Sequence, residues 1–385
     1  MTTLTIASAP AARTDWVALA RELAPGFATR AAAHDADDSF VAENYAELRR
    51  RHVFSAPVPA ALGGGDASYA ELCDLLRALA HGCSSTALAL AMHMHPVSMV
   101  VRRWRDGATA GEPFLRRLAA EELTVVSSGG SDFLAGSGTA EPAEGGFRVS
   151  GHKRFGSGGP AGDVLMTTAV LADPAAGPTV LHFSVPMRGP GVRIVETWRT
   201  LGMRGTGSHD IVLDRVFVPE GAVSIRRPAG RWSPPFHLIY AIALPMIYSV
   251  YLGVAEAARA LALREAQKRR DDPLVQVTAG EMETELATAR MAVADMVAAT
   301  TMAAPGPETT NRVAIGRGVC GRAAVRAVEL AMELGSGGAF YRSLGLERLF
   351  RDVQAARYHP LQRQPQHLYA GRLALGLGVD QPLAP

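Results

Sequence analysis

The sequence predicts an α+β protein in which a helical region, a β-rich region and a second helical region follow one another. Residues 15–118 repeat Ala, Leu and charged residues at helical spacing. Residues 124–225 change to short β-type runs separated by Gly, Pro and Asp. Long helical patterns return after residues 232–236, where two prolines interrupt the chain. We therefore predict an N-terminal helical domain, a central antiparallel β-domain and a C-terminal helical bundle.

Length supports this division, because a single hydrophobic core stops growing at roughly 250–300 residues and the chain has 385. The expected domains comprise residues 1–122, 123–228 and 229–385. The 39 Lys and Arg residues nearly balance the 37 Asp and Glu residues, giving a net charge of +2. Such a charge excludes electrostatic capture of nucleic acid or an anionic membrane as the main function.

Cysteine usage and the N-terminus predict a cytoplasmic protein. Cys73, Cys83 and Cys320 have spacings that match neither a disulfide framework nor a metal site, so reduced, buried thiols and no metal are expected. The first residues lack the basic and apolar regions of a signal peptide. No window approaches the roughly 18 uninterrupted apolar residues of a membrane span.

In the first domain, helices are expected over residues 16–34, 40–54 and 68–104. Pro57, Pro59 and Gly63 to Gly65 separate the second helix from the third. Ser68, followed three residues later by Glu71, predicts a capping box at the start of the third helix.

In the second domain, strands are expected at six places and the last of them requires an irregularity. The predicted strands cover residues 123–128, 146–155, 163–171, 179–185, 191–198 and 210–218. Ile211, Leu213, Val216 and Val218 cannot all face one side of a regular strand, so we expect a bulge near Asp214 and Arg215. Three long helices are expected in the third domain over residues 238–270, 283–303 and 316–335.

Three motifs, taken in order, resemble the acyl-CoA dehydrogenase superfamily across nearly the whole chain. They are residues 126–132 with 151–158, residues 201–219, and the glycine-rich segment 335–359. The resemblance implies a flavin cofactor. It places Ser127 and Ser128 at the flavin edge, Phe155 at its face and Ser157 beside N5, where donors stabilise reduced flavin. Arg204, Thr206 and Ser208 would face the flavin or the substrate.

The same resemblance implies a homodimer or homotetramer. Gly335, Gly337, Gly338 and Arg269 would contact the cofactor of a neighbouring subunit, since glycines permit close backbone approach. Asp271 and Asp272 stand where the family has Phe-Gly, and Glu333 replaces a glutamine. Carboxylates repel a pyrophosphate, so these changes favour a weakly held, exchangeable flavin, either FAD or FMN.

The catalytic glutamate of the dehydrogenases is absent. Its position aligns with Pro360, and the alternative position used by some members aligns with Ala243. Histidines stand nearby instead: His359 beside Pro360, and His93 with His95 in a predicted helix, where residues two apart point about 200° apart. Only one of that pair is expected to face the site.

Histidine at both places resembles the flavin-dependent monooxygenase branch of the superfamily, which includes dibenzothiophene monooxygenases and amino-sugar N-oxygenases. This resemblance implies reduced flavin supplied by a separate reductase, a C4a-hydroperoxide, and oxygenation of a small, partly apolar substrate. His359, Ser157 and His93 would be catalytic, because an imidazole of near-neutral pKa can give and take a proton. His95, Arg204, Tyr240 and Tyr248 would line the substrate pocket.

Two other functions remain open. The first is dehydrogenation of an acyl thioester with His359 as an unusual base, and the second is a flavin-free, non-catalytic family member. Oxygen-dependent product formation with reduced flavin distinguishes the monooxygenase from both.

Overall fold

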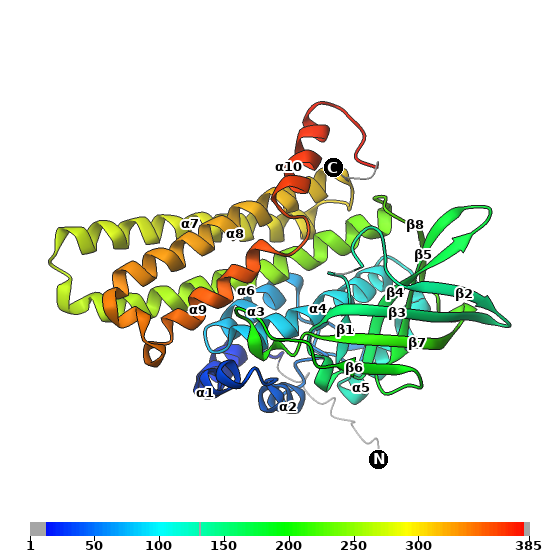
Figure 1. The fold of residues 1–385 in the computed structure, drawn as a ribbon, viewed down its shortest axis with the longest axis horizontal. Helices are drawn as coiled ribbons and strands as arrows, with labels where there is room; N and C mark the ends of the chain where they lie inside the picture. The colour runs from blue at the N-terminus through cyan, green and yellow to red at the C-terminus, as the bar shows by residue number, and fades with distance from the viewer. Residues whose placement is uncertain (1–12, 131, 381–385) are drawn as a thin grey trace, which may run out of the picture.

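The computed structural model describes residues 13–130 and 132–380, and it confirms the α+β class. Ser131 in the first motif, and the N-terminal residues for which no signal peptide is expected, lie outside this range. Figure 1 shows a long helical bundle at one end and a twisted sheet at the other. Helix α4 contacts both the bundle helix α6 and strand β1, so the N-terminal helices connect the two ends.

The N-terminal region is helical, and side chains that cap the helices fix where they begin. Asp15 accepts a hydrogen bond from Ala18 N at 2.9 Å, and Ser68 with Glu71 forms the predicted capping box. The helices are α1 (Trp16–Asp37), α2 (Ala42–Arg50), α3 (Tyr69–Ala80), α4 (Ser84–Arg105) and α5 (Glu112–Glu121), with 3₁₀ turns η1 (Ala60–Leu62) and η2 (Thr109–Gly111).

Eight strands form one sheet in the order β6-β7-β3-β2-β4-β5-β8, with β1 paired to β4. The strands are β1 (Val125–Ser127), β2 (Thr139–Ala143), β3 (Gly146–Gly156), β4 (Val164–Asp173), β5 (Gly177–Pro186), β6 (Val192–Val195), β7 (His209–Pro219) and β8 (Ile225–Pro228). Most pairings are antiparallel, as predicted, but β4 runs parallel to both β1 and β2. Parallel pairing requires a crossover connection, and the intervening strand β3 provides it between β2 and β4.

The predicted bulge in β7 is present. Val149 pairs with Val216 and Gly151 with Leu213, so Asp214 and Arg215 lie opposite a single residue of β3. Arg215 adopts a positive φ of 48° there. A second irregularity lies between Lys153 and Gly156, and here the extra residue is on β3 instead of β7.

Four helices form the bundle, and a fifth packs on its surface. These are α6 (Pro234–Ala266), α7 (Pro273–Met302), α8 (Pro307–Gly335), the short α9 (Leu346–Val353) and α10 (Arg363–Ala374). Helix α9 packs on α6 and α8, and α10 on α8. The 3₁₀ turn η9 (Gln354–Arg357) continues α9 toward His359. Glu256 on α6 binds Arg77 of α3 at 2.6 Å and Arg290 of α7 at 2.8 Å, which ties the bundle to the N-terminal helices.

Helix α6 corrects one expectation. In the described part of the chain, Pro234–Arg269 is the one helix long and apolar enough to cross a membrane, with a mean hydropathy of 1.9 in its most apolar window. That window is 89% buried inside the fold, so its apolar residues form the core of the bundle. Continuous apolar sequence therefore reflects a helix surrounded by other helices.

We predict that Gly253→Ala destabilises the protein. A Cβ atom at this position of α6 would lie 2.3 Å from the carbonyl oxygen of Arg77, so the two helices would have to separate. Overpacking of this kind costs about 1–3 kcal/mol of unfolding free energy, measurable by urea denaturation. The matched control is Gly280→Ala on α7, where a Cβ meets nothing within 4 Å. It should raise stability by about 0.5–1 kcal/mol, and equal effects of the two changes would contradict this explanation.

Candidate functional site

Two histidines from different domains lie at the centre of the site. His359 follows η9, and its Nε2 lies 2.6 Å from the hydroxyl of Tyr251 on α6. His95 on α4 has its Nε2 3.3 Å from Ser127 Oγ, at the end of β1. A charge on His359 would lower the pKa of His95, which shows that the two rings are electrostatically coupled. His95 and Ser127 are therefore in contact, and His359 lies within the range of charge interaction with His95.

Both imidazoles are neutral at pH 7 in the unliganded protein. Burial lowers the pKa of His359 to about 3, and the charge of Arg317 adds to this effect. Burial likewise lowers the pKa of His95 to about 3. This differs from the near-neutral pKa expected for a histidine that gives and takes protons. The cause is removal of water from the charged form.

The contacts of His359 assign its tautomer. Burial raises the pKa of Tyr251 well above its usual value, so the phenol keeps its proton and donates it to His359 Nε2. The proton of the neutral ring is then on Nδ1. Arg317 Nη2 donates to the carbonyl oxygen of His359 at 2.6 Å and fixes the backbone. His359 thus presents one N–H donor, with no partner for Nδ1 among residues 13–130 and 132–380.

His93 has a structural role in this arrangement rather than the predicted catalytic one. Its Nδ1 accepts from Val125 N at 2.9 Å and its Nε2 lies 2.8 Å from the carbonyl oxygen of Phe54. The side chain is fully buried. Nδ1 joins α4 to β1 and Nε2 joins α4 to the segment after α2, so both ring nitrogens of His93 are used within the fold, and His95 is the helical histidine that contacts Ser127.

Phe155 forms an exposed aromatic surface beside the loop that follows Ser127. It occupies the second irregularity of β3 with a positive φ of 62°, which is rare for a bulky residue, and half of its surface is exposed. Its ring packs edge-to-face on Trp198 at 6.0 Å. A Cβ on Gly130 would lie 3.4 Å from the Phe155 ring, so the loop after Ser127 adjoins it. Strained residues of this kind concentrate at ligand sites.

Three hydroxyl groups form a chain of contacts that begins directly after β3. Ser157 Oγ lies 2.7 Å from Ser208 Oγ, which lies 2.6 Å from Thr206 Oγ1. All three side chains are buried. Ser157 therefore lies two residues after Phe155 and at the end of a short polar chain.

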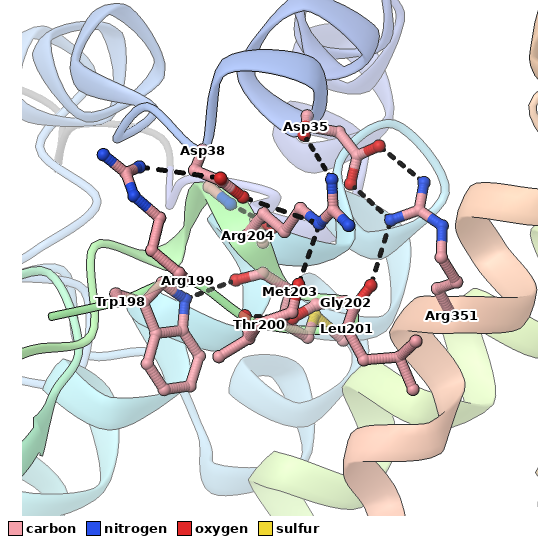
Figure 2. Close-up of polar contacts among 12 residues, drawn as sticks. Asp35, Asp38, Trp198, Arg199, Thr200, Leu201, Gly202, Met203, Arg204 and Arg351 are labelled. Carbon is pink, nitrogen blue, oxygen red and sulfur yellow. Dashed lines mark hydrogen bonds and ion pairs between the residues drawn. The ribbon is translucent and has the colours of Figure 1, made fainter.

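The loop between β6 and β7 is clamped from two sides, as Figure 2 shows. Arg351 on α9 binds Asp35 of α1 through two bonds of 2.6 and 2.9 Å and donates to the carbonyl oxygen of Leu201 at 3.1 Å. Gly202 packs against the same helix, where a Cβ would lie 2.4 Å from Arg351 O. The clamp holds this loop against both helical domains.

Arg204 belongs to this clamp, although it was expected to contact substrate. Its Nε donates to the carbonyl oxygen of Thr200 at 2.9 Å and lies 3.5 Å from Asp38 Oδ1, while Nη1 donates to Asp35 O at 3.3 Å (Figure 2). The guanidinium therefore closes the loop onto the end of α1.

Tyr240 and Tyr248, also expected to line the pocket, instead support the segment that carries His359. Both are fully buried. Tyr248 donates to the carbonyl oxygen of Ala356 at 2.6 Å, and Tyr240 accepts from Leu361 N at 3.3 Å. Their hydroxyls fix the backbone on either side of His359.

Ser128 takes part in a buried polar network of the β-domain. Its hydroxyl lies 2.5 Å from Asp132 Oδ2 and 2.7 Å from Thr167 Oγ1. Asp132 also pairs with Lys153, which is fully buried and whose ammonium donates to the carbonyl oxygen of Thr168 at 2.6 Å. Ser128, which was predicted to lie at the flavin edge, is thus held in place by this hydrogen-bond network.

The remaining predicted cofactor residues form a separate group. Arg269 donates to the carbonyl oxygen of Leu334 at 2.6 Å, which places it beside Gly335 and the exposed Gly337 and Gly338. The turn η7 (Ser336–Phe340) lies at the end of the bundle remote from β3 (Figure 1). Within one chain these residues therefore lie apart from Phe155 and Ser157, as expected if they contact the cofactor of a neighbouring subunit.

Asp272 has a local explanation. Its carboxylate accepts from Leu274 N at 2.9 Å as the N-cap of α7, and Pro273 occupies the first helical position. The Asp-Pro pair thus marks the start of a helix, which explains its presence independently of cofactor binding.

Sequence reasoning missed the roles of Tyr251 and Arg317, and it placed Thr206 and Ser208 at the site without their contact with each other. Tyr251 was recognised only as one of several apolar and aromatic residues in a helix, and no local pattern distinguishes it from Tyr248. The glycines around residues 205–207 do indicate a tight turn that brings Thr206 and Ser208 together. Arg317 lies in an ordinary helical pattern and carries no signal.

The arrangement fits a flavin ring. An exposed aromatic at a strained backbone position, hydroxyls at its side and neutral imidazoles nearby suit a flat heterocycle with polar edges. Phe155 and Trp198 would contact the ring, and Ser157 and Ser127 would supply polar contacts. In the described residues, no group of three His, Cys, Asp or Glu side chains could hold a metal ion.

The burial of His93 predicts how the unfolding free energy depends on pH. Burial lowers its pKa to about 4 from 6.5, so the unfolded chain takes up a proton first as the pH falls. The stability that depends on neutral His93 is complete above pH 6.5 and is lost toward pH 4. His93→Gln keeps one donor and one acceptor without titrating. The loss of unfolding free energy between pH 7 and pH 5, measured by urea denaturation, should therefore be about 1–2 kcal/mol smaller than in the wild type.

The control for this prediction is His367→Gln, because that side chain is exposed on α10. An identical acid loss in His93→Gln and wild type would show that His93 does not set the pH dependence.

Comparison with known proteins agrees with this geometry. The sequence matches the N-terminal, middle and C-terminal domains of acyl-CoA dehydrogenases over residues 15–128, 126–216 and 242–359. It is 28% identical to the putative acyl-CoA dehydrogenase YdbM of Bacillus subtilis, over 90% of this chain and 92% of that protein. It is also 28% identical to the amino sugar nitrososynthase DnmZ of Streptomyces peucetius, over 86% and 85%.

Two further matches concern a monooxygenase and a flavin complex. Indole-3-acetate monooxygenase of Pseudomonas putida is 26% identical over 86% of this chain and 85% of its own. The solved structure of KijD3 with FMN and dTDP-3-amino-2,3,6-trideoxy-4-keto-3-methyl-D-glucose is 28% identical, has a TM-score of 0.86 and covers 97% of this chain and 96% of that one. With all three domains matched in order, the chain belongs to the acyl-CoA dehydrogenase family.

Proposed function

We propose that this protein is a flavin-dependent monooxygenase that uses reduced flavin to oxygenate a small, partly apolar substrate. The observation that carries the proposal is the pair of neutral imidazoles, His95 and His359, at a site with proline in place of the dehydrogenase glutamate. Removal of a proton from carbon requires a base within reach. Within the part of the chain that the structure describes, neither imidazole contacts a carboxylate.

Each residue of the site has a separate role in this reaction. The bound reduced flavin would supply the electrons for oxygen activation. His359 holds its proton at Nδ1 and donates it as a hydrogen bond to an oxygen of the bound reactants, while Tyr251 fixes the ring from the other side. Phe155 and Trp198 bind the flat ring of the cofactor. Displacement of water by these apolar groups strengthens the hydrogen bond from His359.

The relatives support the flavin cofactor. KijD3 was solved with FMN, and relatives of this chain include a monooxygenase and a nitrososynthase. FMN or FAD, an exchangeable flavin and a separate flavin reductase follow from the proposal. Three buried free cysteines suit a cytoplasmic location. The remote group around Arg269 and Gly335 suits a homodimer or homotetramer in which it contacts a neighbouring site.

A second candidate is dehydrogenation of an acyl thioester. The similarity to YdbM favours it, and His359 would then act as the base. Its lowered pKa argues against this role, because a base of pKa about 3 removes protons from carbon poorly.

His359→Ala tests the proposal. Purified protein receives reduced FMN from an NADH-dependent reductase, with indole-3-acetate and the dTDP-linked amino sugar as probe substrates. We expect oxygen-dependent product in the wild type. In His359→Ala, product should fall by about 100-fold or more while hydrogen peroxide per reduced FMN rises, because the proton at Nδ1 is lost.

The matched control is His367→Ala, which removes an exposed imidazole and should keep the wild-type ratio of product to peroxide. Product that forms without oxygen, from an acyl thioester and an artificial electron acceptor, would favour the dehydrogenase. The same product yield in His359→Ala and wild type would remove His359 from the reaction.

A further inference from the structure

Helix α4 carries a half-buried face that continues beyond His95. Between residues 92 and 104, the half-buried side chains of this helix fall into two groups. Val100 and Trp104 pack on the hydrophobic cluster shared with α5, and Trp104 Nε1 donates to Glu112 of α5 at 3.0 Å. The other group comprises Met92, His95, Met99, Arg102 and Arg103.

Helical geometry places members of the second group in one stripe. Successive residues of an α-helix are about 100° apart, so with His95 at 0° Met99 lies at about 40° and Arg103 at about 80°. Val100 and Trp104 lie at about 140° and 180°, on the side that packs against α5. His95, Met99 and Arg103 therefore follow one another along a separate face, which we call the α4 stripe.

The middle of the α4 stripe is apolar and unpacked. Met92, one turn before His95, packs against the main hydrophobic cluster. Met99 packs against none of the three clusters that the described residues form. Its apolar surface is therefore available to a ligand, and the flexible thioether side chain adapts to ligands of different shape.

The far end of the α4 stripe carries one uncompensated positive charge. Arg102 donates to the carboxylate of Asp106 at 3.0 and 3.2 Å, so these two charges cancel. Arg105 binds Asp66 at 3.0 Å. The half-buried Arg103 forms neither an ion pair nor a side-chain hydrogen bond with any residue in 13–130 or 132–380. Its guanidinium thus offers parallel N–H donors that match a carboxylate or a phosphate.

The spacing of the α4 stripe defines the kind of molecule that fits it. Eight residues separate His95 from Arg103, which corresponds to about 12 Å along the helix axis. In order, the stripe presents a neutral imidazole, an apolar side chain and a cation. A molecule that matches it has an uncharged reacting end, an apolar middle and an anionic group at its far end.

We propose that Arg103 is a specificity-determining residue, which binds a carboxylate or phosphate at the end of the substrate remote from the reacting atom. The inference rests on the proposed function, in which the reacting atom lies beside His95 and His359. It assigns the substrate to the class of partly apolar anions. The two imidazoles are neutral, so Arg103 supplies the positive charge that an anionic substrate requires.

Matched anionic and neutral probes test the inference by binding alone. The carboxylate 6-phenylhexanoate is compared with its neutral amide, and 6-phenylhexyl phosphate with 6-phenylhexanol. Each is titrated calorimetrically into protein loaded with oxidised FMN, at low ionic strength, where charges are least screened. We expect the wild type to bind at least one anion about tenfold or more tightly than its neutral counterpart, since hydrogen bonds to charged groups are strong. The pair that shows this preference identifies the anionic group.

Variants of Arg103 then locate the charge that is responsible. Arg103→Gln should weaken binding of the anion about tenfold and leave binding of the neutral probe unchanged. Arg103→Lys keeps the charge but loses the planar fork, so it should keep part of the preference. The matched control is Arg105→Gln, which removes a cation from the same helix and should keep the full preference.

The outcomes separate this inference from the proposed function. Wild-type protein that binds neither anion more tightly than its neutral counterpart overturns the inference, and so does an Arg103→Gln variant that keeps the preference. An equal loss of affinity for charged and neutral probes would show a structural role only, and weaker binding of FMN itself would assign the charge to the cofactor; either result overturns the inference.

Oxygen-dependent product that requires His359 would in each of these cases leave the proposed function standing. Conversely, a charge preference that depends on Arg103, together with product formed without oxygen, would keep the anion site and reject the monooxygenase.

Discussion

One pair of adjacent residues joins the three domains. Asp352 on α9 is buried, and its carboxylate accepts from Ser84 at the start of α4 and from Met203 N in the loop between β6 and β7. Arg351 repeats this pattern with Asp35 of α1 and the carbonyl oxygen of Leu201. Hydrogen bonds to charged groups are roughly twice as strong as neutral ones. The bundle, the N-terminal helices and the sheet are therefore all connected through these two residues.

The site depends on this junction because each domain supplies part of it. His359 comes from the bundle, His95 from the N-terminal helices, and Phe155 with Ser157 from the sheet. His359 lies seven residues after Asp352, and Arg317, Tyr248 and Tyr240 hold the backbone at His359, at Ala356 before it and at Leu361 after it. Reacting groups need placement within a fraction of an ångström. A rigid connection between domains provides that placement without any contact of the two clamp residues with the reactants.

Local signals in the sequence predicted local structure well. The capping box at Ser68 and the bulge at Asp214 depend on residues close in the chain, and both are present. The parallel pairings of β4 were missed, because they depend on how β3 crosses the sheet. Asp272 was interpreted as a change in cofactor binding, and the structure gives it a second role, because Asp followed by Pro is also a signal for the start of a helix.

Side-chain roles were harder to predict, because partners far apart in sequence decide them. His93 and His95 look alike in the helix, and only the positions of Phe54 O and Val125 N assign one of them to the structure. Arg204, Tyr240 and Tyr248 have the chemistry expected of binding residues, but tertiary contacts use their polar atoms. A residue type thus indicates what a side chain can do, while its hydrogen-bond partners determine what remains available.

The low charge of the site has a chemical consequence. His95 and His359 are both neutral because burial lowers the pKa of each, and a charge on His359 would lower the pKa of His95 further. Ser127, Ser157 and Tyr251 add only neutral groups. A carboxylate base would bring a fixed negative charge that repels an electron-rich cofactor or a reactive oxygen anion. Neutral donors whose directions are fixed by the fold can instead hold such an anion, and this supports a change from proton abstraction to oxygen chemistry within one family.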